Sequence, residues 1–199
     1  MKKVTTALAL RPRGGDALER YLAEVEQHPL LSREEELELA RRYKDEGDVR
    51  AAHKLVVSNL RFVVKVARQF NGYGLRVLDL IQEGNVGLMV AVKKFDPERG
   101  YRLISYAVWW IKAHIRSFVL RSWSMVKLGT TRNQRKLFFK LRSARNALER
   151  EARETGGVAE APELAESLGV KEQDVTDMEA RLAARDFSLD KTMQAEGSA

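Results

Sequence analysis

Hydrophobic residues recur at intervals of three and four along most of the chain, which is the spacing of one face of an α-helix. The clearest run predicts a long helix over about 48–70. Its inward face would carry Leu55, Val56, Leu60, Val63, Val64 and Ala67. Similar runs predict helices over about 77–95, 104–120 and 132–154. No segment shows the strict alternation of a half-buried strand, so the sequence predicts an all-α fold.

Turn-forming and capping residues separate these predicted helices. Ser32 precedes three consecutive glutamates, as at a helix N-terminus, and Gly47 ends that helix. Segments 71–74 and 96–100 are turns by composition. Residues 161–185, with a turn at Gly169, resemble a helix-turn-helix.

Charge is distributed unevenly along the chain. Residues 93–145 carry 14 lysines and arginines but 2 acidic residues, whereas residues 146–199 carry 6 basic and 13 acidic side chains. A concentrated basic stretch is typical of proteins that bind a polyanion, and nucleic acid is the leading candidate. The alternative is a basic surface that serves only solubility, but such surfaces normally intersperse both signs.

Composition excludes several classes of protein. The chain has 199 residues, enough for one large or two small domains, and it has no cysteine, which excludes disulfide scaffolds, thiolate metal sites and thiol nucleophiles. It has no uncharged apolar run of about 18 residues, and the short apolar stretch 4–10 contains two threonines. We therefore expect neither a membrane span nor a secretory signal. We expect a cytoplasmic protein.

Residues suited to catalysis are not grouped. The histidines His28, His53 and His114 lie far apart, and neither a GxxxxGK[ST] loop nor a GxSxG motif occurs. Asp79 and Glu83 would share a helix face, but a solvated surface explains them better than a catalytic pair. We predict no enzyme activity, no metal site and no cofactor.

Segment 101–112 combines aromatic and basic residues. On a helix, Tyr106, Trp109 and Trp110 fall within three to four residues of one another. Cations flank these rings at Arg99, Arg102, Lys112 and Arg116. Aromatic faces beside cations suit unstacked bases on a phosphate backbone, where stacking is worth roughly 1–3 kcal/mol per base. The alternative is that the three rings belong to the core.

Three segments together resemble the signature segments of bacterial RNA polymerase sigma factors, in the same order and spacing. They read NLRFV at 59–63, DLIQEGNVGLM at 79–89 and YAVWWIK at 106–112. Residues 134–142, QRKLFFKLR, are similar to the box distinctive of heat-shock sigma factors, with Lys140 in place of an expected asparagine. The resemblance covers about residues 16–190.

The resemblance implies that the helix over 79–89 docks on the clamp helices of the beta-prime subunit of core RNA polymerase. The contact residues would be Asp79, Gln82, Glu83, Asn85 and Met89. In the heat-shock class, the box over 134–142 is implicated in polymerase binding and in control by chaperones and proteolysis. We therefore expect charge reversal at Lys136 and Lys140 to alter polymerase or DNA affinity without unfolding.

The resemblance also implies contacts with promoter DNA, both as a duplex and as the displaced non-template strand. The pocket for a flipped adenine of the minus-ten element would be lined by Phe95, Arg99, Tyr101 and Tyr106. Trp109 and Trp110 would form a wedge at the upstream edge of the melted bubble. Asn59 and Arg61 would hold the displaced strand, with Lys112 and Arg116 on phosphates. The family positions that lie next to an extended minus-ten element correspond here to Thr131, Gln134 and Arg135.

The sequence departs from the housekeeping members of this family. Those members carry glutamine and threonine where this chain has Ala113 and Arg116, so we expect a different preference for duplex minus-ten DNA. Nothing in the chain matches the C-terminal domain that reads the minus-thirty-five element. We therefore expect a truncated chain, a gene fragment or an unusually short member. The net charge of −7 over 146–199 argues against the second helix of 161–185 lying along phosphates.

We predict two helical domains joined by a short linker: sigma domain 2 over 16–124 and a helix-turn-helix-like sigma domain 3 over 130–185. Residues 1–15 and 186–199 would be disordered, the latter as the start of a linker. The predicted function is binding core polymerase and recognising and melting the minus-ten element, with chaperones or an anti-sigma antagonist as further partners. The alternatives are a module that binds polymerase or an antagonist without initiating transcription, and a stand-alone helical regulator of duplex DNA.

Overall fold

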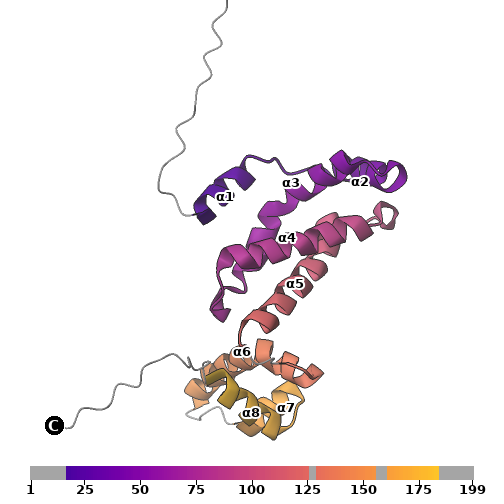
Figure 1. Cartoon of the computed structure of the whole chain (residues 1–199). Coiled ribbons are helices and arrows are strands. Elements are labelled where there is room, and N and C mark those ends of the chain that lie inside the picture. The colour runs from indigo at the N-terminus through magenta and orange to yellow at the C-terminus, as the bar shows by residue number, and fades with distance from the viewer. Residues whose placement is uncertain (1–16, 126–128, 156–160, 184–199) are drawn as a thin grey trace, which may run out of the picture. The chain divides into compact units, whose positions relative to one another are not determined.

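The computed structural model describes residues 17–125, 129–155 and 161–183, and the predicted tails at 1–15 and 186–199 lie outside these ranges. The chain divides into two compact units, the first ending at Val119 and the second beginning at Leu120. Every regular element among the described residues is a helix (Figure 1), which confirms the predicted all-α fold. No described helix is both long enough and apolar enough to span a bilayer.

The first unit is built around α3 and α4, two long helices that follow one another in the chain and pack together in opposite directions (Figure 1). Its elements in chain order are α1 (Ala17–Glu26), α2 (Arg33–Glu46), α3 (Val49–Arg68), the 3₁₀ turn η1 (Asn71–Tyr73), α4 (Val77–Lys94), the 3₁₀ turn η2 (Pro97–Arg99) and α5 (Leu103–Ser122), whose last turn belongs to the second unit. Both α1 and α2 pack against α3. The core of this unit therefore forms around α3 and α4.

Local sequence signals set the ends of these helices. At the start of α2, the Ser32 hydroxyl accepts from the Glu35 amide at 3.2 Å and the Glu35 carboxylate accepts from the Ser32 amide at 2.9 Å, which is a capping box. At its end, Gly47 has a φ of 68°, a left-handed conformation that glycine adopts without a steric penalty. Asp48 then caps α3 through its carboxylate.

Two glycines allow α4 to lie unusually close to its neighbours. A Cβ at Gly87 would lie 2.8 Å from the Trp110 carbonyl oxygen and 2.9 Å from the Ile111 Cα, both on the backbone of α5. A Cβ at Gly84 would lie 2.6 Å from a methyl carbon of Val63 on α3. The predicted docking segment therefore packs closely against both α3 and α5, and on α5 it meets the backbone at Trp110.

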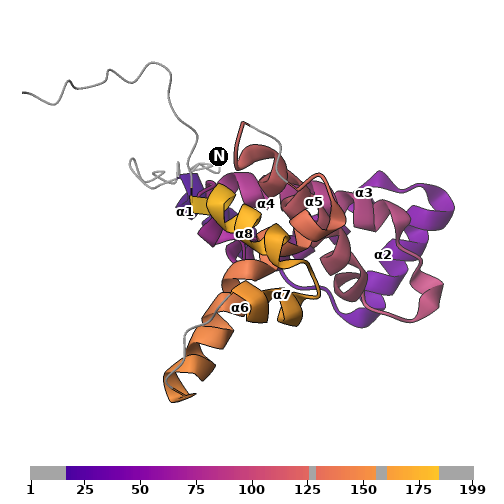
Figure 2. The same cartoon turned by 90° about the horizontal axis from the view of Figure 1, so that it is seen from below.

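The second unit contains α6 (Arg132–Thr155), α7 (Ala161–Leu168) and α8 (Glu172–Ala183), which pack on one another (Figure 2). On α6, Leu148 is half-buried, whereas Leu137, Phe138 and Leu141 are buried. They form the core of the unit together with Leu164, Leu168, Val175 and Met178. Gly169, with a φ of 58°, makes the predicted turn between α7 and α8.

Candidate functional site

One face of α4 leaves apolar side chains in solvent. Met89 is 50% exposed and Val86 is 41% exposed, and Gln82 lies one turn before Val86 on the same face. The opposite face is buried through Leu80 and Leu88. Polar and apolar side chains mixed on an exposed helix face are typical of a surface that binds a partner.

Two other predicted contact residues of α4 have partners within the chain. The half-buried Asp79 forms an ion pair with Arg76 at 2.9 Å. Asn85 donates from Nδ2 to the hydroxyl of Tyr21 on α1 at 3.1 Å and to the side-chain oxygen of Gln82 at 3.3 Å. The contact with Tyr21 was missed by sequence reasoning, since no local pattern relates residues 64 positions apart.

Aromatic rings gather where α4 ends and α5 begins. Phe95 and Tyr106 have ring centroids 6.2 Å apart, and Tyr106 meets Trp110 at 6.3 Å in an edge-on arrangement. The ammonium of Lys94 lies 4.2 Å from the centroid of Trp110, within the range of a cation–π interaction. The structure thus brings together three of the predicted DNA-binding rings beside a cation that sequence reasoning did not single out.

Trp109 and Trp110 differ sharply in their surroundings. Trp109 is 74% exposed, whereas Trp110 is partly covered by Tyr106 and Lys94. Neither ring belongs to the buried core, so the alternative prediction that the tryptophans are core residues is wrong. The buried positions of this part of α5 are Leu103, Ala107, Ile111, Ile115 and Val119.

The loop between α4 and α5 carries the remaining predicted pocket residues. Tyr101 is 61% exposed, and Arg99 is also exposed while its guanidinium lies 3.4 Å from the Asp96 carboxylate. Further along α5, Lys112 is half-buried and Arg116 is exposed. These side chains thus come from two segments, the loop before α5 and the later turns of α5.

Contacts from α2 hold that loop in place. Glu36, only 3% exposed, receives two hydrogen bonds from the Arg102 guanidinium, each 3.1 Å long, and one from the Leu103 amide at 2.9 Å. Arg102 was predicted to flank the rings as one of four cations, but its guanidinium is bound to a buried carboxylate and is not available to DNA in this arrangement. Glu36, which sequence reasoning missed, therefore fixes the start of α5.

Ion pairs on the surface extend this connection. Arg41 binds Glu98 at 2.8 Å, and Lys44 binds Asp96 at 2.7 Å. The hydrogen bond from Lys44 lowers the pKa of Asp96 below its usual value, and the hydrogen bond from Arg41 does the same to the pKa of Glu98. Both pairs are thus fully charged at neutral pH.

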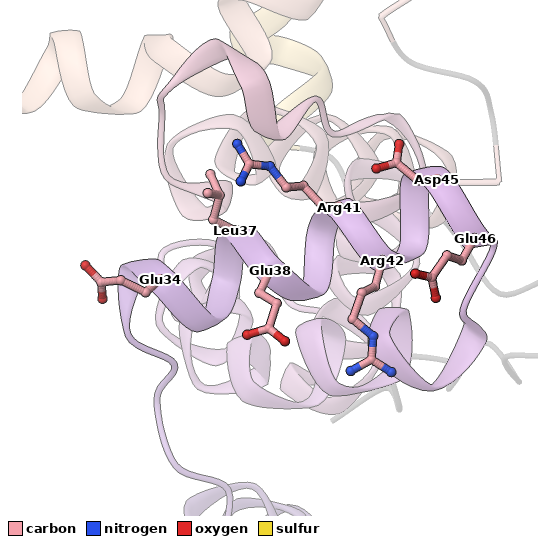
Figure 3. Close-up of a pocket in the computed structure, with 7 residues that line it drawn as sticks. All are labelled: Glu34, Leu37, Glu38, Arg41, Arg42, Asp45 and Glu46. Atoms are coloured by element: carbon pink, nitrogen blue, oxygen red, sulfur yellow. The ribbon is translucent and has the colours of Figure 1, made fainter.

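A depression on the outer surface of α2 does not form a second site. Its lining consists of Glu34, Leu37, Glu38, Arg41, Arg42, Asp45 and Glu46 (Figure 3). All seven side chains come from one helix, so no opposing wall converges on a ligand. Among the described residues there is also no cluster of three histidine or acidic side chains that could hold a metal ion.

The two predicted strand-holding residues of α3 differ in accessibility. Arg61 is exposed and borders a cleft between α1 and α3, together with the cations Lys65 and Arg68. Asn59 is only 5% exposed and donates to the Leu55 carbonyl oxygen at 2.7 Å. The predicted DNA contact of Asn59 is therefore corrected: its side chain faces the interior and its amide is bound within α3.

In the second unit, the predicted extended minus-ten residues lie at the start of α6. Thr131 and Gln134 form a capping box, since the Gln134 amide donates to the Thr131 hydroxyl at 3.2 Å and the Gln134 side-chain oxygen accepts from the Thr131 amide at 3.3 Å. Arg135 is exposed beside them. Thr131 and Gln134 therefore already have a structural role as helix caps.

Lys136 also has a structural role. Its ammonium donates to the carbonyl oxygen of Leu168, the last residue of α7, and so caps that helix. Lys140, one turn further along α6, is exposed. Charge reversal at Lys136 should therefore reduce stability, because it would place a carboxylate against a helix C-terminus.

Comparison with known proteins places this chain in a family. The family model described as Sigma-70 region 2 matches residues 55–125, and the model described as Sigma-70 factor, region 1.2 matches residues 16–48. The RNA polymerase sigma-C factor of Myxococcus xanthus is 52% identical over 184 residues, covering 92% of this chain and 62% of its own length. The chain belongs to the sigma-70 family.

Other sigma-factor relatives are similarly close. RNA polymerase sigma factor RpoH of Caulobacter vibrioides is 47% identical over 196 residues, 98% of this chain and 65% of its own length. RpoH of Zymomonas mobilis is 50% identical over 188 residues, 92% of this chain and 62% of its own length. The predicted resemblance to sigma factors of the heat-shock class is thereby confirmed. The chain spans a little under two thirds of the length of these curated relatives.

The sigma-70 family models divide the site between two regions. Region 1.2 covers α1 and α2, which supply Tyr21 and Glu36, and region 2 covers most of α3 together with α4 and α5. The buried Glu36–Arg102 ion pair and the Tyr21–Asn85 hydrogen bond therefore both join region 1.2 to region 2.

Proposed function

We propose that this chain directs core RNA polymerase to promoters, where it recognises and melts the minus-ten element. The observation that carries the proposal is one compact unit that presents two different surfaces on adjoining helices. One is the exposed face of α4 with Gln82, Val86 and Met89, and the other is the aromatic and cationic surface around Tyr106 and Trp109. Membership of the sigma-70 family supports the same function.

The α4 face would bind the clamp helices of the beta-prime subunit. Asp79, Gln82, Glu83, Asn85 and Met89 remain the proposed contact residues. Gln82 and Met89 are exposed, which suits direct contact, whereas Asp79, Glu83 and Asn85 are half-buried and present only part of each side chain. A partner that covers this face would bury two apolar side chains now in solvent, which favours association.

The aromatic surface would bind melted DNA. We propose that Phe95, Arg99, Tyr101 and Tyr106 receive the flipped adenine, and that Trp109 stacks at the upstream edge of the bubble with Trp110 beneath it. Arg61, Lys112 and Arg116 would contact phosphates, and Arg135 would lie near an extended minus-ten element with Thr131 and Gln134. Stacking at roughly 1–3 kcal/mol per base is comparable to the few kcal/mol needed to unstack one.

We further propose that residues 16–124 form sigma domain 2, residues 130–185 form sigma domain 3, and the chain acts in the heat-shock class. The QRKLFFKLR segment and the relatives named RpoH support that class. The chain would act without catalysing a reaction itself. Chaperones or an anti-sigma antagonist are further proposed partners.

A binding experiment tests the docking face directly. Gln82→Ala combined with Asn85→Ala should weaken the affinity of the chain for core polymerase while circular dichroism shows unchanged helicity. The matched control is Gln69→Ala with Asn71→Ala, another exposed glutamine and asparagine outside α4. Equal polymerase affinity of the two double variants would refute the docking face.

Transcription assays separate initiation from simple titration of polymerase. The chain assembled with core polymerase should produce transcripts from a promoter with a strong extended minus-ten element. Binding without transcripts would favour the module that occupies polymerase without initiating. Duplex DNA binding without any polymerase binding would favour the stand-alone regulator.

A further inference from the structure

Tyr21 belongs to α1 but makes its polar contact on α4. The neighbouring α1 residues Leu22 and Val25 line the cleft toward α3, and Val25 is buried. The half-buried Tyr21 ring instead brings its hydroxyl within 3.1 Å of Nδ2 of Asn85. Asn85 lies on the same helix as the exposed Gln82 and Met89, so α1 reaches the edge of the proposed docking face.

The direction of this hydrogen bond leaves the Tyr21 O–H and the Asn85 side-chain oxygen without hydrogen-bond partners in the described part of the chain. Since the Asn85 amide nitrogen is the donor, the Tyr21 oxygen is the acceptor, and its O–H can still donate. Among the described residues the Tyr21 hydroxyl takes part in this one hydrogen bond and donates none, and the Asn85 side-chain oxygen is buried without a hydrogen-bond partner. A buried polar atom without a partner costs free energy until a donor reaches it.

Tyr21 keeps its proton over a wide pH range. Burial is the main cause that raises the pKa of Tyr21, and the Asn85 hydrogen bond opposes it only in part. The hydroxyl is therefore a permanent donor at the edge of α4. Gln82 holds the Asn85 amide from the other side at 3.3 Å, so the Asn85 side chain is oriented by two acceptors at once.

We propose that the polymerase-docking surface continues from α4 onto α1, where the Tyr21 hydroxyl orients Asn85 and donates a hydrogen bond to an acceptor oxygen of core polymerase. This inference rests on the docking function proposed above. Tyr21 is a positioning residue as well as a contact, because it acts on polymerase partly through Asn85.

The test compares Tyr21→Phe, Asn85→Ala and the double variant of the full chain in equilibrium binding to core polymerase. Tyr21→Phe removes only the hydroxyl and should weaken binding about five- to tenfold, the effect of one hydrogen bond. The double variant should lose less affinity than the product of the two single losses, because both residues act in one unit. Tyr43→Phe, which alters a half-buried tyrosine of α2, is the matched control and should change nothing.

A second measurement does not depend on polymerase. The NMR signals of the Asn85 side-chain amide should shift in Tyr21→Phe, while the melting temperature changes little. Unchanged affinity in Tyr21→Phe, with weaker binding by Gln82→Ala and Asn85→Ala, would overturn this inference and leave the docking function standing. If the double variant lost as much affinity as the product of the two single losses, the positioning role of Tyr21 would be wrong. Unchanged affinity in all of these variants would refute the docking function itself.

Discussion

Trp109 and Trp110 are adjacent in the chain, yet the structure predicts different consequences for their removal. Trp109→Ala should leave stability unchanged, because the ring is 74% exposed. In polymerase holoenzyme it should impair opening of duplex promoters far more than binding of templates already melted across the minus-ten element, where no base must be unstacked. Permanganate reactivity of unpaired thymines measures the open complex. Equal defects on both templates would exclude a wedge role.

Trp110→Ala should also destabilise the fold. The substitution removes an edge-on aromatic contact with Tyr106 and the cation–π contact with Lys94. Together these contacts are worth about 1–2 kcal/mol. Urea denaturation of the free protein should therefore separate Trp110→Ala from Trp109→Ala. If both variants unfold at the same urea concentration as the parent chain, the packing role of Trp110 is wrong.

Among the acidic residues of the first unit, Glu36 is the one whose replacement should lower the stability of the fold most. Glu36→Gln leaves the Arg102 guanidinium without its charged partner and weakens the bond to the Leu103 amide. Breaking a buried ion pair costs about 3–5 kcal/mol, and we expect about 2–3 kcal/mol here because Arg102 is partly solvated. Glu98→Gln, which breaks an exposed pair with Arg41, should barely change stability. Equal urea midpoints for the two variants would contradict this prediction.

At the scale of elements, the contact between α4 and α5 depends on a glycine, Gly87, which has no side chain to separate the two helices. Gly87→Ala would place a Cβ against the backbone at Trp110 and Ile111, which cannot move aside as a flexible side chain can. Overpacking of this kind typically costs about 1–3 kcal/mol. Val86→Ala, at the exposed neighbouring position, is the control and should be nearly neutral. Thermal unfolding of both variants, followed by circular dichroism, tests the difference.

Gly87→Ala should also affect DNA opening through the position of α5. The two tryptophans are carried by the same backbone that the added methyl group would displace. Holoenzyme containing this variant should therefore form fewer open complexes even at temperatures where the chain stays folded. Normal promoter opening in the folded variant would show that the α4–α5 distance is not critical for melting.

In the second unit, two lysines of α6 should respond differently to neutralisation. Lys136→Met removes the donor to the last carbonyl of α7 and should cost about 1 kcal/mol, whereas Lys140→Met removes only an exposed charge. Hydrogen exchange of the α7 amides should accelerate in Lys136→Met alone. Equal exchange in the two variants would mean that Lys136 does not hold α7.

At the scale of the whole molecule, the basic surface should make DNA affinity dependent on salt. Each phosphate contact on a single strand contributes about 0.7 to the slope of log affinity against log salt concentration. Arg61→Ala in holoenzyme should lower that slope by this amount on a non-template-strand oligonucleotide. Arg41→Ala, whose guanidinium is already paired with Glu98, should not. An unchanged slope in Arg61→Ala would remove Arg61 from the strand contact.

The sequence by itself determined the helices and the family of this protein. Helical periodicity depends on backbone geometry between near neighbours, so the helices over 77–95 and 104–120 appear in the structure as Val77–Lys94 and Leu103–Ser122. Caps such as Ser32 and Gly47 are equally local. The resemblance to sigma factors likewise required only the order of residues in short segments.

Tertiary structure alone decided which polar side chains are available to a partner. The partners of Arg102 and Asn85 lie 66 and 64 residues away, so only the packing of whole helices brings them together. Asn59 lies on a predicted amphipathic helix, but its side chain is buried, and Val63 one turn further along packs against Gly84 of α4. Periodicity fixes which residues share a face, whereas the neighbours that cover that face come from distant parts of the chain.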